Sequence, residues 1–271
     1  MYHNTKEITV NFENKDYTAM MSLYLPDLSD ELAIKRRKTL LILPGGAYSM
    51  TSDREAEPIA LEFCAKGFNC IVLRYSVFPI TFPVSLLEVS KAIMLIRENA
   101  EIWNVDTDDI IVCGFSAGAH LASCIGTLWN LPIIKDTLNI KNELNKPSRL
   151  ILGYPVITSG TKAHLASIEN LLGDKISDKY YLDLVSTEKQ VTKETPPTFI
   201  WHTYSDKDVY VENSLLFATA LAKNKVPFEL HIFEKGNHGL SLASEITALN
   251  EGNLEKTCEC WTDLATTWIN K

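Results

Sequence analysis

The sequence lacks the features of several protein classes. Only 12 glycines and 11 prolines occur in 271 residues, and 46% of the residues are hydrophobic, which excludes a collagen-like, low-complexity or disordered chain. Cationic side chains are scarce too, since 26 Lys and Arg stand against 34 Asp and Glu and leave a formal net charge of −8. Such a chain has no basic field to hold a phosphate backbone, so we expect no nucleic-acid partner.

Long uninterrupted apolar segments, of the length of a membrane span, are also missing. No Asp, Glu, Lys or Arg occurs between Ile110 and Ile134, but three glycines, Pro132 and several polar residues interrupt this stretch. This favours a buried strand followed by a buried helix over a membrane span, so we expect no membrane partner. The first seven residues lack the apolar core of a secretory signal, which predicts a cytoplasmic protein.

Metal-binding and redox patterns are absent from the cysteines. Six cysteines occur, mostly inside apolar runs, where a reduced thiol behaves as a small hydrophobic side chain. None belongs to a Cys-x-x-Cys pair of the kind found in zinc and redox sites, and the pair Cys258-x-Cys260 has no second ligand pair. We therefore expect no metal and no other cofactor.

What the chain does contain is a regular alternation of strand-like and helix-like segments. Apolar runs predict a hairpin at 8–12 and 17–25, and then strands at 39–43, 69–74, 110–113, 150–154, 198–203 and 228–233. Helical spacing predicts helices at 55–66, 85–100, 117–128, 214–223 and 254–269. This order predicts a doubly wound α/β fold, with a mostly parallel central sheet and helices on both faces, in one domain over residues 1–271.

The alternation stops between Tyr154 and Thr198. This segment is polar, rich in lysine and weakly periodic, and it is too long for an ordinary loop. We interpret residues of about 155–195 as an excursion over the carboxyl ends of the strands, and hence as a short lid.

A nucleophile is predicted where the strand 110–113 meets the helix 117–128. Gly114-Phe-Ser116-Ala-Gly118 lies at this junction, which is the strand-turn-helix setting of a nucleophile elbow. In such an elbow the serine occupies a strained turn that exposes its hydroxyl, and side chains at the flanking glycine positions would clash with neighbouring backbone. We therefore identify Ser116 as the candidate nucleophile.

A serine hydroxyl needs a base and an orienting acid, and both are expected at the carboxyl ends of later strands. Asp206 follows the strand 198–203 directly, and His238 lies between glycines just after the strand 228–233. The chain order Ser116, Asp206, His238 is that of α/β hydrolases. Asp208 is the alternative acid, although a turn or helix-capping role explains it better.

The other histidines are better explained by structural roles. His120 faces inward on the helix that begins after the elbow, and His202 is placed to brace the acid loop. His164 lies in the excursion, where it could contact a substrate, whereas His3 and His231 look like surface or strand residues.

A tetrahedral intermediate needs N–H donors at the elbow and in the turn after the strand 39–43. The first donor is Ala117, directly after the nucleophile. The second is expected from Gly45 and Gly46, because paired glycines let the backbone turn its amides toward the site. These three residues form the candidate oxyanion hole.

Several motifs, taken in order from about Leu40 to the end of the chain, resemble the α/β-hydrolase carbohydrate esterases. The similarity is to the acetyl-xylan-esterase-like branch, near the hormone-sensitive lipases. Two departures occur: the His-Gly-Gly-Gly of those lipases appears as Pro44-Gly-Gly-Ala47, and the usual Val-Pro-Val appears as Val209-Tyr-Val211. The matching motifs are Leu43-Pro-Gly-Gly-Ala-Tyr48, Gly114-Phe-Ser-Ala-Gly-Ala-His-Leu-Ala122, Thr195-Pro-Pro-Thr-Phe-Ile-Trp-His-Thr203 and Phe233-Glu-Lys-Gly-Asn-His-Gly-Leu-Ser241.

The resemblance implies the α/β-hydrolase fold and a metal-independent serine esterase with the triad Ser116, Asp206 and His238. The expected substrate is a small ester, above all an acetylated carbohydrate such as a xylo-oligosaccharide, with Tyr48 and Phe78 as aromatic walls for the sugar. A short-chain carboxylesterase or lipase-like enzyme and a peptidase remain alternatives, because the same triad serves them. A non-catalytic binding protein on the same scaffold is the alternative from another class, and the sequence leaves a homo-oligomer open.

Overall fold

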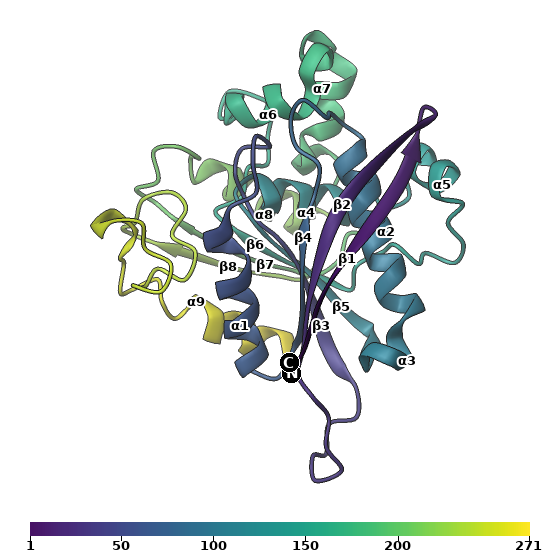
Figure 1. Ribbon diagram of the computed structural model, residues 1–271. Helices are drawn as coiled ribbons and strands as arrows, with labels where there is room; N and C mark the ends of the chain where they lie inside the picture. The colour runs from purple at the N-terminus through teal and green to yellow at the C-terminus, as the bar shows by residue number, and fades with distance from the viewer.

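The computed structural model describes residues 1–271 and contains one eight-stranded sheet in the order β1-β2-β4-β3-β5-β6-β7-β8 (Figure 1). β2 pairs antiparallel with both β1 and β4, and all other neighbours are parallel. The strands are β1 (Tyr2–Phe12), β2 (Lys15–Leu25), β3 (Arg37–Leu43), β4 (Asn69–Arg74), β5 (Val105–Phe115), β6 (Arg149–Gly153), β7 (Thr198–Thr203) and β8 (Phe228–Phe233). This is the predicted α/β-hydrolase architecture, with an antiparallel hairpin at one edge.

Alternate residues along each central strand face two separate apolar cores. In β3, for example, Leu41 and Leu43 pack with one core, while Leu40 and Ile42 pack with the other. The larger core includes side chains from α2, α4 and α8, and the smaller one includes side chains from α1 and α9. Helices therefore cover both faces of the sheet, which explains why the central strands are continuous apolar runs.

Nine α-helices connect or flank the strands. Four short 3₁₀ segments occur in addition, at Asp53–Glu55, Gly173–Ser177, Thr187–Lys189 and Glu251–Asn253. The helices are α1 (Glu57–Ala65), α2 (Val84–Glu98), α3 (Ala100–Trp103), α4 (Ala117–Leu128), α5 (Pro132–Leu138), α6 (Leu165–Leu172), α7 (Lys179–Val185), α8 (Glu212–Lys223) and α9 (Trp261–Ile269).

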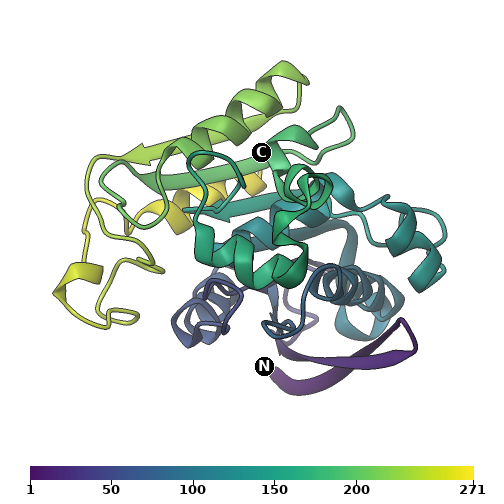
Figure 2. The same ribbon diagram turned by 90° about the horizontal axis from the view of Figure 1, so that it is seen from above.

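The excursion predicted between β6 and β7 contains α6 and α7. Figure 1 places both helices at the top of the molecule, and the view from above in Figure 2 shows them over the middle of the sheet. The Asn170 side chain of α6 donates a 2.8 Å hydrogen bond to the carbonyl of Ala47, in the turn after β3. The excursion is thus attached to the carboxyl end of the strands.

Two predicted helices begin later than expected. The helix expected from residue 254 begins only at Trp261, because residues before it form turns in which the Glu255 side chain accepts from the backbone N–H and hydroxyl of Thr257. The helix expected from Glu55 begins at Glu57, with Pro58 in its first turn, where a missing N–H costs nothing.

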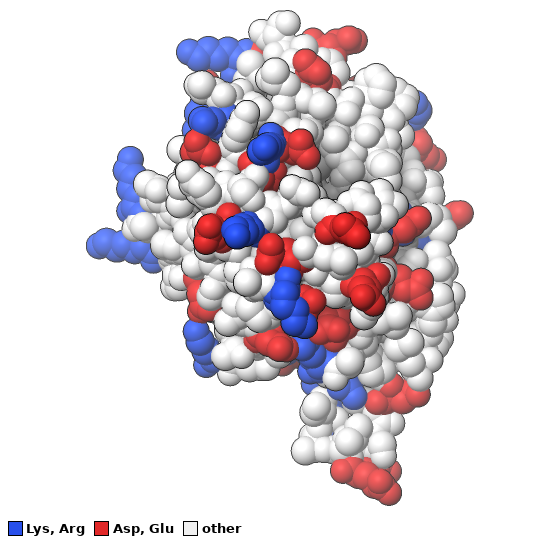
Figure 3. Space-filling model, turned by 90° about the vertical axis from the view of Figure 1, so that its left-hand side faces the viewer, with Lys and Arg blue, Asp and Glu red and all other residues white.

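Charged side chains of both signs are interspersed on the surface in Figure 3. No helix is both long enough and apolar enough to cross a lipid bilayer. The uncharged stretch from Ile110 instead runs through the end of β5 and through α4, both of which are buried.

Candidate active site

Ser116 forms a sharp corner between β5 and α4. Its backbone has φ 51° and ψ −117°, a strained combination for a residue with a side chain. Gly118 makes the corner possible, because a Cβ at this position would overlap the carbonyl oxygen of Leu43. The local sequence therefore folds as the predicted elbow, at the carboxyl end of β5.

Ser116, His238 and Asp206 lie in a hydrogen-bonded line. The Ser116 Oγ is 2.7 Å from Nε2 of His238, and Nδ1 of the same imidazole is 2.7 Å from Oδ2 of Asp206. Asp206 follows β7 and His238 follows β8, so neighbouring strands bring the two side chains together. This geometry allows His238 to accept a proton from Ser116 while Asp206 holds the imidazole by its other nitrogen.

The Asp206 carboxylate is buried and fully surrounded by donors. Its Oδ1 accepts the backbone N–H groups of Asp208 at 2.9 Å and Val209 at 3.0 Å, and its Oδ2 also faces His202 Nε2 at 3.3 Å. Burial raises the pKa of Asp206, but the hydrogen bonds from His202 and His238 outweigh it and hold the pKa well below its usual range. Asp206 therefore remains ionised. The Asp208 carboxylate makes no hydrogen bond with His238.

Two further histidines have the structural roles expected of them. His120 is buried, with Nε2 donating to the carbonyl of Val185 and Nδ1 accepting from the Tyr48 hydroxyl, both at 2.8 Å. Burial lowers the pKa of His120 to about 4, so its imidazole is neutral near pH 7. His202 accepts from Ser214 at Nδ1, which fixes the orientation in which it faces the acid.

The turn after β3 supplies free N–H groups, though not all of those expected. The Gly45 N–H donates to Oε2 of Glu55 at 2.7 Å and is unavailable to a ligand, which corrects its assignment as an oxyanion donor. The N–H groups of Gly46 and Ala47 have no acceptor within the protein. Ala117 begins α4, so its N–H has no partner inside the helix. The donors left for an oxyanion are thus Gly46, Ala47 and Ala117.

A pocket of about 400 Å³ opens over Ser116, and two of its twelve lining residues, Ala47 and Met50, are hydrophobic. His164, whose Nδ1 bonds Ser167 at 2.8 Å, has no protein partner at Nε2, and the exposed Asp208 carboxylate has none at either oxygen. Burial and the neighbouring His238 lower the pKa of His164, while Asp208 raises it. The lining residues are Gly46, Ala47, Ser49, Met50, Ser52, Arg54, Glu55, Ser116, His164, Asp208, His238 and Gly239.

The aromatic residues expected to wall the pocket lie elsewhere. Tyr48 is only 1% exposed, because its ring packs in the core and its hydroxyl bonds His120, so the expectation that it contacts substrate is wrong. Phe78 is 51% exposed but is not part of the pocket lining, and its N–H donates to the Tyr48 carbonyl at 2.8 Å.

Arg54 and Glu55 are pocket residues that sequence reasoning missed. Arg54 donates from Nη2 to the carbonyl of Gly239 at 2.8 Å, next to His238, and Glu55 holds Gly45. The only local signal was the acidic start of the following helix, which by itself indicates helix stabilisation rather than a role in a site.

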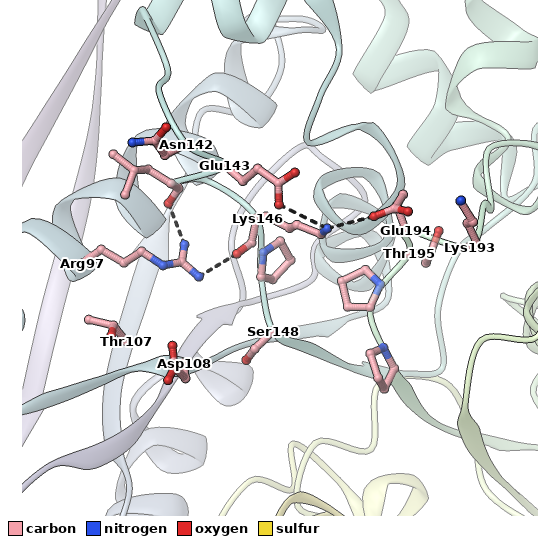
Figure 4. Close-up of a pocket in the computed structure, with 14 residues that line it drawn as sticks. Arg97, Thr107, Asp108, Asn142, Glu143, Lys146, Ser148, Lys193, Glu194 and Thr195 are labelled. Atoms are coloured by element: carbon pink, nitrogen blue, oxygen red, sulfur yellow. Dashed lines mark hydrogen bonds and ion pairs between the residues drawn. The ribbon is translucent and has the colours of Figure 1, made fainter.

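A second hollow, of about 490 Å³, lies at the amino ends of β5, β6 and β7 (Figure 4). Two of its three cations bind the protein itself: Arg97 donates to the carbonyls of Leu144 and Lys146, and the Lys146 ammonium lies between Glu143 and Glu194. Across the whole chain, no cluster of three or more His, Cys, Asp or Glu side chains has an arrangement that could hold a metal ion.

Comparison with known proteins places this chain among esterases. The family model described as BD-FAE matches residues 21–221. The chain is 39% identical to endo-1,4-beta-xylanase B of Butyrivibrio fibrisolvens over 78% of its length, and 28% identical to an acetylxylan esterase of Xylanibacter ruminicola over 88%. It covers 33% and 47% of those two relatives, so it spans between a third and a half of their length.

Solved structures are similar over nearly the whole chain. The acetyl ester-xyloside bifunctional hydrolase of Caldicellulosiruptor lactoaceticus has a TM-score of 0.80 at 37% identity, with 94% of this chain and 88% of that one covered. The carboxylesterase Cest-2923 of Lactobacillus plantarum has a TM-score of 0.83 at 26% identity, with 98% and 97% covered.

Proposed function

Because the chain belongs to the BD-FAE family of α/β hydrolases, we propose that it is a serine esterase that removes acetyl groups from carbohydrates such as acetylated xylo-oligosaccharides. The observation that carries this proposal is the line of hydrogen bonds from Ser116 through His238 to Asp206. The acetylxylan esterase and the acetyl ester-xyloside hydrolase among the similar proteins support the acyl group and the sugar.

In the proposed reaction Ser116 Oγ attacks the ester carbonyl carbon, and its proton passes to Nε2 of His238. The oxyanion accepts hydrogen bonds from Ala117 and from the Gly46 or Ala47 N–H, each contributing about 3 kcal/mol to the lowering of the barrier. His238 then protonates the leaving sugar oxygen, which leaves the acetyl group on Ser116. A water molecule, deprotonated by the same imidazole, attacks the acyl carbon. Acetate is then released as Ser116 Oγ takes the proton back from His238.

Two side chains of the pocket offer free hydrogen-bonding groups to a hydroxylated alcohol. His164 and Asp208 offer a nitrogen and a carboxylate that no protein group occupies, so sugar hydroxyls can bind there without displacing an existing hydrogen bond. His164 comes from the excursion at about 155–195, which we propose forms the lid-side wall of the sugar site.

A short-chain carboxylesterase is the second candidate, favoured by the similarity to Cest-2923. The test compares acetate release from acetylated xylo-oligosaccharides with hydrolysis of p-nitrophenyl acetate and p-nitrophenyl octanoate. Efficient release from the sugar supports the carbohydrate deacetylase. Hydrolysis of the synthetic acetate without sugar deacetylation supports the general carboxylesterase instead.

A further inference from the structure

Glu55 is a buried carboxylate that none of the proposed chemical steps uses. It ends the short 3₁₀ segment before α1 and is 4% exposed. Its two oxygens accept from different parts of the site: Oε2 from the Gly45 N–H at 2.7 Å and Oε1 from the Tyr154 hydroxyl at 2.6 Å. A buried carboxylate is costly unless such donors satisfy it, so this arrangement needs a reason beyond packing.

On one side, Glu55 holds the turn that carries the free N–H groups. A Cβ on Gly45 would lie 2.8 Å from Glu55 Oε2 and 2.9 Å from the Cβ of Ser116. The Glu55 carboxylate, the turn at Gly45 and the nucleophile Ser116 are therefore closely packed. The next amide, that of Gly46, is separated from this N–H only by the two backbone dihedrals of Gly45, so holding Gly45 in place limits where the Gly46 N–H can lie. The carboxylate therefore sets where the turn stands relative to Ser116.

On the other side, Tyr154 connects Glu55 to the histidine loop. The Tyr154 hydroxyl accepts the N–H of Ser241 at 2.9 Å, and its ring lies edge-on to the His238 imidazole, with centroids 5.1 Å apart. Burial and the nearby Glu55 raise the pKa of Tyr154 well above its ordinary value, so the phenol stays protonated and donates to the carboxylate. Ser241 in turn donates from Oγ to the carbonyl of Arg54 at 2.6 Å.

We propose that Glu55, acting through Tyr154, is a positioning residue that holds the oxyanion turn (residues 44–48) and the loop of His238 in register with Ser116. Glu55 touches neither the substrate nor the reacting atoms in this role. The inference rests on the proposed serine-esterase function, because it concerns the alignment of the oxyanion donors with the base.

The test uses two variants of the full chain, Tyr154→Phe and Glu55→Gln. Tyr154→Phe keeps the ring against His238 but removes the hydroxyl that joins the two halves of the site, and Glu55→Gln replaces one acceptor oxygen by a donor. With p-nitrophenyl acetate we expect kcat to fall about 10- to 100-fold, because a displacement near 1 Å has effects of this size, while KM stays within about threefold.

A second readout separates positioning from loss of fold. A methyl trifluoromethyl ketone adds Ser116 Oγ reversibly to its carbonyl and forms a tetrahedral oxyanion, so its inhibition constant reports the aligned donors. We expect this constant to rise by the same factor by which kcat/KM falls. Asn145→Ala is the matched control, since it removes a buried 2.7 Å hydrogen bond to Trp129 at the amino end of the sheet and should lower the melting temperature without either effect.

Two outcomes overturn the positioning role: wild-type kcat in both variants, or losses of kcat that the unfolded fraction fully explains while inhibitor binding per folded molecule is unchanged. Ser116→Ala is assayed beside them. If Ser116→Ala is inactive and both variants are fully active, the inference fails and the esterase stands. If Ser116→Ala keeps wild-type activity, the proposed function itself fails.

Discussion

The two ends of the sheet each carry a hollow of similar volume, about 490 Å³ at the amino end and about 400 Å³ at the carboxyl end. At the amino end, the guanidinium of Arg97 binds backbone carbonyls and the ammonium of Lys146 binds two carboxylates. At the carboxyl end, the N–H groups of Gly46 and Ala47 and the Nε2 of His164 bind nothing in the protein. The Lys193 and Asp108 side chains at the amino end have no partners either, so neither volume nor free polar groups distinguish the two hollows. The difference is the hydrogen-bonded line from Ser116 through His238 to Asp206, which lies beside the free N–H groups at the carboxyl end.

Removing one serine at each end tests this difference most directly. Ser116→Ala deletes the proposed nucleophile and should lower kcat on p-nitrophenyl acetate by about 10⁴-fold or more. Ser148→Ala removes a hydroxyl that donates to the Ile110 carbonyl at the amino end and should leave kcat unchanged. Steady-state assays with equal amounts of folded protein check both, and substantial activity in Ser116→Ala would reverse the assignment of the two ends.

The two aspartates after β7 test which carboxylate at the carboxyl end orients His238. Asp206→Asn should lower kcat by about 10³- to 10⁴-fold, because an amide facing Nδ1 of His238 favours the wrong tautomer. Asp208→Asn leaves this contact intact and should keep kcat on p-nitrophenyl acetate within about threefold. A larger loss in Asp208→Asn than in Asp206→Asn would contradict the observed line of hydrogen bonds.

The sequence predicts best those elements whose ends are marked by the residues directly next to them. β4, β7, β8 and α4 have the predicted bounds, because an apolar run or helical stripe in each is closed by glycine or polar residues next to it. The tail helix is shorter than predicted, since side-chain contacts around Glu255 compete with helix formation before Trp261.

Site residues can be predicted from the sequence when their chemistry requires them at the carboxyl end of a strand. Ser116, Asp206 and His238 meet this condition, and the structure brings them together. The predictions for Gly45 and Tyr48 are wrong because these residues hydrogen-bond Glu55 and His120 instead of a ligand. Nothing in the local sequence indicates these partners. The link from Glu55 to Tyr154 spans 99 residues, so only the assembled sheet reveals it.

Glu88 faces Ser76, just after β4, and differs from Asp208 because both of its oxygens have partners in the protein: Ser76 donates its N–H at 2.6 Å and its hydroxyl. Burial raises the pKa of Glu88 to about 7, despite these hydrogen bonds. The native state thus binds the proton more tightly than the unfolded chain, so this group's contribution to the free energy of unfolding is lost as pH rises from about 4.5 to 7. The loss is about 3 kcal/mol.

Glu88→Gln should remove this part of the pH dependence without changing the catalytic line. Urea unfolding at pH 5 and pH 8 measures it: the difference in unfolding free energy between the two pH values should be smaller in the variant by about 2–3 kcal/mol. Equal pH dependence in the two proteins would show that Glu88 titrates normally in the folded state.

The smallest expected effect concerns a free hydrogen-bonding group at the carboxyl end, the Nε2 of His164, rather than a reacting group. If the unused Nε2 of His164 binds a sugar hydroxyl, His164→Ala loses one hydrogen bond, about 1 kcal/mol, and KM for acetylated xylo-oligosaccharides rises about fivefold. KM for p-nitrophenyl acetate should not change, since that ester has no sugar. Ser167→Ala breaks the bond at Nδ1 but keeps the imidazole, so it should resemble wild type. An equal rise in KM for both esters would mean that His164 shapes the pocket without recognising the sugar. The free Nε2 of His164 would then have no role in binding the sugar.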